Sequence, residues 1–218
     1  LPEGQANFTD VEALASGKVL AAGTLKGRFL AARFLRNGRR DPAFGRKGVS
    51  SFDLDGQFGC KCSAAVAMAR DRHGRILLAG YTMKYGLGDA DLQPTVIRLK
   101  RNGRLDRSFG VNGVTRPQLS EYLELPDGRP VRRFLTTGLT LQSDGKIVIS
   151  GEYNFRYSLL RLKPNGKPDA SFFDAGVYVD WVRGRYGAAW DVITDRKGRI
   201  VSSGGTSDGG FVLMRMLP

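Results

Sequence analysis

The sequence predicts an all-β fold, a β-propeller made of four repeats that each form a blade of four antiparallel strands. Three observations predict it. A short motif of turn glycine, basic residue, apolar run and second glycine occurs four times. Strand-like runs stand before and after each copy of this motif. The strands are mostly small or apolar, which suits sheets packed on both faces better than one open sheet with alternating polarity.

The repeated motif marks the first hairpin of each repeat. The copies are ASGKVLAAG from Ala15, RHGRILLAG from Arg72, SDGKIVISG from Ser143 and RKGRIVSSG from Arg196. Successive turn glycines lie 57, 71 and 53 residues apart, so insertions separate constant cores. The runs before the turns are VEAL, AVAM, LTL and WDVI. Strand, glycine turn and strand predict a β-hairpin in every repeat.

A third strand follows each hairpin and carries one arginine. The four runs are FLAARF from Phe29, TVIRL from Thr95, YSLLRL from Tyr157 and FVLMRM from Phe211. In the first three repeats an Asn-Gly turn follows, as in RNGRLDRSFGVNG, and then a fourth strand around VSSFDL, VTRPQL or VYVDWV. Asn-Gly favours a tight turn with positive φ, so the sequence predicts a second hairpin in these repeats.

An aspartate and a phenylalanine recur at fixed positions in these connections. The aspartates are Asp41, Asp106 and Asp169, each eight residues after the repeat arginine, and the phenylalanines are Phe44, Phe109 and Phe172. A residue repeated once per blade usually serves the blade. We therefore expect an Arg-Asp pair that braces the turn and aromatic rings that fill the seams between blades, rather than a catalytic carboxylate array.

The chain is predicted to be a single domain over residues 1–218, with repeats at about 8–54, 63–119, 135–182 and 187–218. The fourth repeat stops after its third strand, and its open edge needs a cover. We expect residues Leu1 to Ala6 to supply that strand and close the ring. Two chains in a larger ring, or a longer parent protein, are the alternatives. A start at Leu1 suits a mature chain or a fragment.

The composition of the chain limits the ligands, metals and catalytic groups that the sequence predicts. The 34 lysines and arginines outnumber the 21 aspartates and glutamates, giving a net charge of +13, which attracts polyanions or simply keeps the surface soluble. No apolar run approaches the roughly 20 residues of a membrane-spanning helix. Cys60 and Cys62 are expected to be free thiols, and His73 a turn residue. Asp89 and Asp91 offer too few carboxylates for calcium, so we predict no metal site and no cofactor.

The combination of DGKIV-x-x-G with N-G-x-x-D-x-S-F-G-x-x-G resembles the delta-60 repeat family of bacterial proteins. The resemblance covers nearly the whole chain and is clearest in the second and third repeats; the third has Phe173 in place of the expected glycine. It implies propeller-like repeats and an exported location, extracellular, periplasmic or at the cell surface. It implies no catalytic residues.

Function is expected where the repeats differ, because loops on a rigid scaffold usually carry it. In a four-stranded blade the second-to-third loop and the blade-to-blade loop emerge on one side, and the extra residues fall there: Thr82 to Pro94, and linkers near 55–63, 120–134 and 183–187. The candidate binding residues are Tyr85, Tyr122, Arg132, Arg133, Trp181, Arg183, Arg185 and Tyr186, with Lys61, Lys84 and Arg129 nearby.

Arginines interleaved with aromatic residues suit an anionic glycan, because guanidinium groups pair with carboxylates while rings stack on sugars. We therefore predict a non-catalytic, exported module that recognises an anionic polysaccharide or a protein partner through this loop-rich face. Nucleic acid is a less favoured partner. The rival hypothesis is a hydrolase or lyase acting on a polyanion, with Arg132 or Arg183 neutralising charge and Tyr122 or Tyr186 as general base, but it lacks a convincing acid-base pair.

Overall fold

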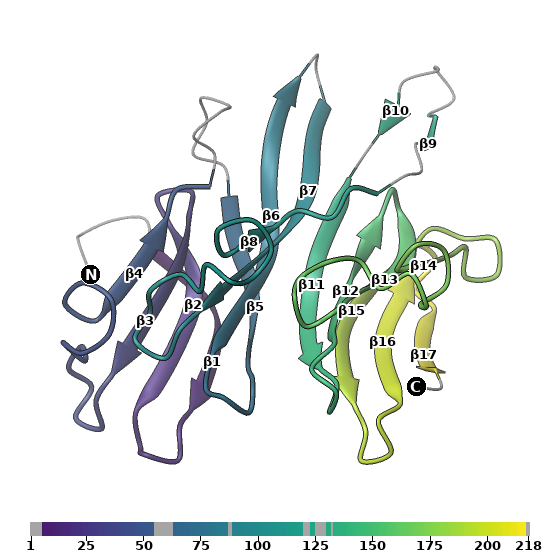
Figure 1. The fold of residues 1–218 in the computed structure, drawn as a ribbon. Helices are drawn as coiled ribbons and strands as arrows, with labels where there is room; N and C mark the ends of the chain where they lie inside the picture. Colours follow the sequence, from purple (N-terminus) through teal and green to yellow (C-terminus); the bar gives the residue numbers. More distant parts are fainter. Residues whose placement is uncertain are drawn as a thin grey trace.

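The computed structural model describes residues 6–54, 63–86, 89–119, 123–124, 130–131 and 133–216. Of residues 84–86, 89–91, 123–124 and 130–131 it describes only the backbone. These residues form four antiparallel sheets of three or four strands, which lie side by side (Figure 1), and one separate pair of short strands. The predicted all-β, propeller-like fold is confirmed. No helix in the described part of the chain has the length and hydropathy needed to cross a membrane.

The first three sheets have four strands each and the fourth has three. The first contains β1 (Ala6–Ala13), β2 (Val19–Leu25), β3 (Arg28–Phe34) and β4 (Val49–Phe52). The second contains β5 (Ser63–Arg70), β6 (Ile76–Gly86), β7 (Asp89–Leu99) and β8 (Val114–Thr115). The third contains β11 (Phe134–Leu141), β12 (Ile147–Tyr153), β13 (Arg156–Leu162) and β14 (Val177–Asp180). The fourth contains β15 (Gly187–Thr194), β16 (Ile200–Thr206) and β17 (Phe211–Met216).

The strand order within each sheet follows the chain, so the sheets are meanders. Each first strand carries a β-bulge at the same place, as between Phe8 and Asp10 in β1 and between Ala189 and Asp191 in β15. The first strand of each later sheet also contacts the sheet before it: β5 packs on β1, β2 and β3, β11 on β5, β6 and β7, and β15 on β11, β12 and β13. Three seams therefore join four sheets in sequence.

Each seam has its own apolar core, because both faces of the strands carry apolar side chains. Phe29 and Phe44 of the first sheet pack with Ile76 and Leu78 of the second. The same positions recur in the later seams, where Phe109 packs against the third sheet and Phe172 against the fourth. The predicted role of the repeated phenylalanines as side chains that fill the seams is confirmed.

The predicted Arg-Asp brace is also confirmed. Arg98 Nε donates a hydrogen bond of 2.8 Å to Asp106 Oδ2, and the pair is buried. The equivalent bonds are 2.7 Å from Arg33 to Asp41 and 2.9 Å from Arg161 to Asp169.

Two expectations need correction. The insertion from Thr82 to Pro94 was expected to be a loop, but it continues β6 and β7 as one long hairpin, since Thr82 and Leu92 keep the alternation and are buried. Ala6 was expected to help close the fourth sheet, but it pairs with Leu25 inside the first. The expected clasp by residues 1–5 lies outside the described residues, as do Cys60 and Cys62. The linker between the second and third sheets holds a further pair, β9 (Leu123–Glu124) and β10 (Pro130–Val131).

The two ends of the sheets differ. One end carries the connections between first and second strands and between third and fourth strands; we call it the turn side. These connections have constant lengths. Those between first and second strands have five residues, and those between third and fourth strands have fourteen. The other end carries the hairpin loops between second and third strands and the links between sheets; we call it the loop side. Sequence variation among the repeats is concentrated on the loop side.

Candidate functional site

Aromatic and arginine side chains gather on the loop side of the third sheet, where the β12–β13 hairpin meets the segment after β14. The ring centroids of Trp181 and Tyr186 are 5.3 Å apart, and those of Phe155 and Tyr186 are 6.0 Å apart. The exposed fractions of Phe155, Trp181 and Tyr186 are 43%, 39% and 56%. With Arg133 and Arg156, which stack against them, we call these residues the ring cluster.

The two arginines hold the rings in place. The guanidinium carbon of Arg156 lies 5.6 Å from the ring centre of Trp181 and 5.8 Å from that of Tyr153. The guanidinium carbon of Arg133 lies 5.3 Å from the ring centre of Phe155, and Arg133 also pairs with Glu152. A cation over an aromatic face is attracted by the ring quadrupole, by about 0.5–1 kcal/mol at exposed sites. The rings of Phe155 and Trp181 are therefore braced by arginines while they stay partly exposed to solvent.

The turn that presents Phe155 is strained. Asn154 and Phe155 form the two-residue β12–β13 turn with φ of 50° and 64°. The first sheet has Lys26 and Gly27 at the same place, and Gly27 takes a φ of 69° without a side-chain penalty. A phenylalanine in the left-handed region costs about 1–2 kcal/mol. Lys47, Phe173 and Ala175 in the turn-side connections also have positive φ, so this strain makes Phe155 one candidate among several for a special role.

The segment after β14 carries two further arginines. It turns sharply, with Gly184 N donating to Trp181 O at 3.1 Å and Arg185 N donating to Val182 O at 3.1 Å. Arg185 forms an ion pair of 2.8 Å with Asp208, from the β16–β17 loop. Arg183 is exposed and makes no ion pair with the described residues. Arg183 is therefore available to a carboxylate that approaches the rings.

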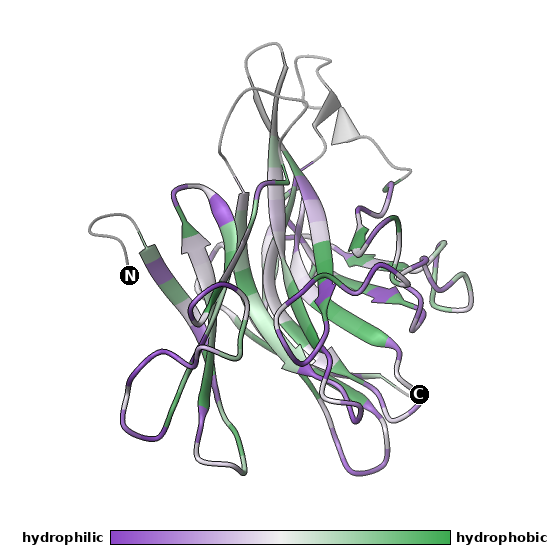
Figure 2. Ribbon diagram, turned by 60° about the vertical axis from the view of Figure 1, so that its left-hand side comes forward, coloured by the Kyte–Doolittle hydropathy of each residue, from purple (hydrophilic) through white to green (hydrophobic). Residues whose placement is uncertain are grey.

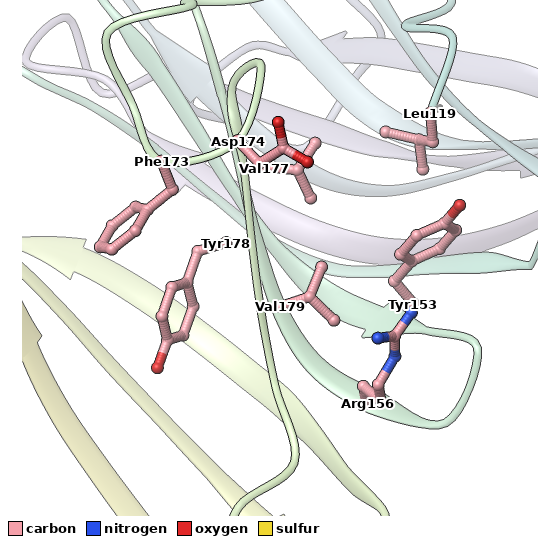
Figure 3. Close-up of a pocket in the computed structure, with 8 residues that line it drawn as sticks. All are labelled: Leu119, Tyr153, Arg156, Phe173, Asp174, Val177, Tyr178 and Val179. Atoms are coloured by element: carbon pink, nitrogen blue, oxygen red, sulfur yellow. The ribbon is translucent and has the colours of Figure 1, made fainter. Parts of the chain in front are cut away.

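A pocket of about 440 Å³ adjoins the ring cluster at Arg156. Figure 3 shows Val177 and Val179 of β14 pointing toward Leu119 and Tyr153, with Arg156 at the side of the pocket, whereas Phe173 and Tyr178 lie on the other side of the strand. Apolar walls with few polar groups are typical of small-molecule sites.

Tyr178, which lies between Val177 and Val179 in β14, is a neutral phenol. Burial, together with the hydrogen bond of 2.9 Å that its hydroxyl donates to Asp180 Oδ2, raises the pKa of Tyr178 well above its ordinary value. Its ring lies 4.7 Å from that of Phe173, which is 58% exposed. The residue thus supplies an aromatic surface and no charge near neutral pH.

The structure brings together several residues that the sequence singled out. Trp181, Tyr186 and Arg133 belong to the ring cluster, and Arg183 and Arg185 lie in the segment between Trp181 and Tyr186. Tyr85 and Lys84 lie in β6 without described side chains. The remaining predicted residues, Tyr122, Arg132, Lys61 and Arg129, lie outside the described residues.

Sequence reasoning missed Phe155, Arg156 and the pocket that Arg156 lines. A signal existed for Phe155. It occupies the position of Gly27 in the first repeat, and a large side chain at a turn position that favours glycine indicates a special role. The pocket had no signal, because the side chains that line it come from segments up to 60 residues apart.

The excess positive charge lies mostly away from the ring cluster. The turn-side connections, residues 14–18, 35–48, 71–75, 100–113, 142–146, 163–176 and 195–199, contain 18 lysines and arginines and seven aspartates. They account for +11 of the net +13, and Figure 2 shows hydrophilic residues concentrated in these connections. No cluster of three or more histidine, cysteine, aspartate or glutamate side chains that could hold a metal is found among the described residues.

Comparison with known proteins supports the fold. The model of a family described as "Domain of unknown function (DUF5122) beta-propeller" matches residues 74–109 and 142–172, which include most of the repeat motif and the Asn-Gly turn of the second and third sheets. No curated protein matches the chain.

Three solved structures illustrate the likeness. A glucose dehydrogenase is 15% identical with a TM-score of 0.52 over 99% of this chain and 64% of its own. A luciferin-regenerating enzyme is 11% identical with a TM-score of 0.50, over 98% of this chain and 63% of its own. A catalytically inactive virginiamycin B lyase from Staphylococcus aureus with quinupristin is 12% identical with a TM-score of 0.50, over 100% of this chain and 58% of its own. The chain therefore spans about three fifths of these proteins, and at these identities the likeness shows the fold alone.

Proposed function

We propose that the protein is an exported, non-catalytic module of the delta-60 repeat type that binds an anionic saccharide at the ring cluster. The observation that carries the proposal is the row of exposed rings, Phe155, Trp181 and Tyr186, with exposed Arg183 beside them. Rings of this kind stack on the apolar faces of sugars, and a guanidinium group pairs with the carboxylate of a uronic acid.

The surrounding charges fit a saccharide with isolated carboxylates better than a densely charged polymer. Arg133 and Arg185 are already paired with Glu152 and Asp208, so Arg183 is the arginine beside the rings that we expect to meet a ligand carboxylate. The turn-side charge is at the other end of the sheets and is screened over a Debye length of about 8 Å, so it attracts an anionic chain to the protein without selecting the ring cluster. Stacking at the rings would then select the ligand.

A protein partner is the second candidate. Tryptophan, tyrosine and arginine are the residues enriched at binding hot spots, and the ring cluster consists of them together with Phe155. The pocket of about 440 Å³ would accept one side chain of such a partner.

The saccharide proposal can be tested by tryptophan fluorescence. The chain has two tryptophans, Trp181 in the ring cluster and Trp190 in the fourth sheet. In a Trp190→Phe background, an oligosaccharide of uronic acids is expected to change the emission of Trp181, and the matching neutral oligosaccharide is expected to bind more weakly. Arg183→Gln should weaken uronate binding about tenfold, equivalent to about 1.4 kcal/mol.

Arg196→Gln serves as the matched control, because it removes the same charge from the turn side. It is expected to leave the affinity within about twofold. Equal binding of neutral and acidic oligosaccharides, or an equal loss in the two arginine variants, would contradict the proposal. No binding of any saccharide would leave the protein partner as the better candidate.

A further inference from the structure

Every seam between sheets is built from the same repeat positions. We call the face of a sheet that points to the next sheet its forward face, and the opposite face its back face. In the seam between the third and fourth sheets, the forward face presents Val148, Tyr157 and Leu159, and the back face of the fourth sheet presents Ile200 and Met214. Tyr157 and Leu159 have an exposed fraction of 0%.

The forward face of the fourth sheet carries the same kind of residues, and no other sheet of the described residues covers it. Phe211 and Leu213 stand at the repeat positions of Tyr157 and Leu159, and their exposed fractions are 72% and 67%. The alternation along β17 leaves Phe211, Leu213 and Arg215 outside while Val212, Met214 and Met216 pack inward.

Two large side chains of β15 extend this apolar surface. Trp190 and Ile193 are each 56% exposed. The indole of Trp190 lies over Gly205 of β16, where a Cβ atom would come within 2.4 Å of Cζ2. The glycine therefore leaves room for the indole ring next to Phe211, which pairs with Gly205. An exposed surface of four large apolar side chains on one sheet face marks an interaction site.

The back face of the first sheet has the complementary repeat pattern. The residues that the second sheet uses against the first are Ala65, Met68, Ile76, Leu78, Ile97 and Leu99. The first sheet has apolar residues at all the same positions: Phe8, Val11, Val19, Ala21, Ala32 and Phe34. Phe8 and Val11 are 41% and 65% exposed, and the ring of Phe8 packs edge-on against Phe34 at 6.1 Å.

We propose that the forward face of the fourth sheet packs on the back face of the first sheet of a second copy of this chain. The contact would repeat the seam that already joins the sheets inside the chain. Two such contacts, related by a twofold axis, close two copies into a ring of eight sheets. This inference does not rest on the proposed saccharide site, which lies on the loop side of the third sheet.

Charge opposes this contact only weakly. The net charge of +13 is mostly on the turn-side connections, whereas the two faces themselves carry few charged residues, of which Arg215 and Asp191 lie on the forward face of the fourth sheet. Salt screens the repulsion between the two copies and leaves apolar burial intact. The association should therefore strengthen, or stay constant, as salt is raised.

Sedimentation equilibrium of the full chain over a range of concentrations tests the inference. The expected result is a species of twice the chain mass of 23.8 kDa, which persists at high salt. Leu213→Asp is expected to convert it to a monomer by weakening association at least 100-fold, because a carboxylate would be buried in the seam. Val111→Asp, a matched change at a residue that is 78% exposed in a turn-side connection, should leave the dimer unchanged.

The Val11→Asp variant tests whether the back face of the first sheet takes part in the contact between the two copies. In the proposed arrangement it breaks the dimer as Leu213→Asp does, since both faces take part. A dimer that survives Val11→Asp would be joined through two fourth sheets and would overturn the inference. A wild-type chain that stays monomeric at every concentration would overturn it too. Circular dichroism checks that each variant keeps the β-sheet signal of the wild type.

Discussion

At the scale of single residues, the same three side chains lock each complete sheet to its turn-side connection. In the second sheet Arg98 pairs with Asp106, and its guanidinium carbon lies 4.7 Å from the ring centre of Phe109. Arg98 also donates through Nη1 to the carbonyl oxygen of Pro164 in the third sheet, at 2.8 Å. One arginine therefore joins a turn, an aromatic side chain and the neighbouring sheet.

The charge state of Asp106 controls this arrangement. Burial alone would raise the pKa of Asp106, but hydrogen bonds from Ser108 and the charge and hydrogen bond of Arg98 outweigh burial and place the pKa below its ordinary value. A carboxyl group with a lowered pKa contributes stability above the pKa of the unfolded chain, about 3.9, and this contribution is lost as the pH falls through the folded-state pKa.

Asp106→Ala should therefore lower the free energy of unfolding by about 3 kcal/mol at pH 7, because it leaves Arg98 buried without its partner. The difference from the wild type should be constant from pH 7 to 5 and shrink below pH 4. Urea denaturation at a series of pH values measures both effects. The double variant Arg98→Met, Asp106→Leu is the control and should be much less destabilised than Asp106→Ala. A difference that stayed constant down to pH 3 would show that the carboxylate charge is not what matters.

At the scale of elements, the sequence predicted the first hairpin of each repeat, the third strand and the Asn-Gly connection, because glycine turns and apolar runs are local signals. The bulge between Phe8 and Asp10 and the long hairpin around Thr82 could not be predicted, because they depend on pairing across strands. For the site, Trp181 and Tyr186 were identified from their place in a variable loop. Arg156 was not, because its role comes from its distance to Trp181 and the pocket rather than from any motif.

The Asn-Gly turns offer a direct comparison between a seam and an open face. Gly38 and Gly103 occupy the same repeat position, with φ of 77° and 81°. A Cβ atom on Gly38 would have no heavy atom within 4 Å, but one on Gly103 would lie 2.6 Å from Ser50 Oγ and 2.9 Å from Phe44 Cζ. The difference arises because the first sheet has no sheet before it in the described chain.

Gly38→Ala should lower the free energy of unfolding by about 1 kcal/mol, the cost of positive φ for a residue with a side chain. Gly103→Ala should cost a further 1–3 kcal/mol, because the methyl group overpacks the seam. Thermal and urea denaturation of the two variants give the comparison, and Gly38→Ala acts as the control for backbone strain. Equal losses in the two variants would mean that Phe44 moves aside and that the seam is loosely packed.

At the scale of the whole molecule, the sheets are joined in a row, and stability depends on how many neighbours each sheet has. Among the described residues, the second and third sheets have a seam on both faces, whereas the first and fourth have one each. The open forward face of the fourth sheet, with Phe211 and Leu213, is the feature on which assembly depends in our second proposal.

Amide hydrogen exchange should show that the sheets of the row differ in stability. β12 and β16 each lie between two partner strands of their own sheet, so their backbone hydrogen bonding is alike. We expect amides of β16 to exchange at least tenfold faster than those of β12 in dilute protein, because the fourth sheet has only one seam and opens without disturbing the third. As the concentration is raised, protection of β16 should increase in the wild type and stay low in Leu213→Asp, because only the wild type gains a second seam. Equal protection of β12 and β16 at every concentration would mean that the four sheets unfold as one unit, and that the exposed face of the fourth sheet does not lower its stability.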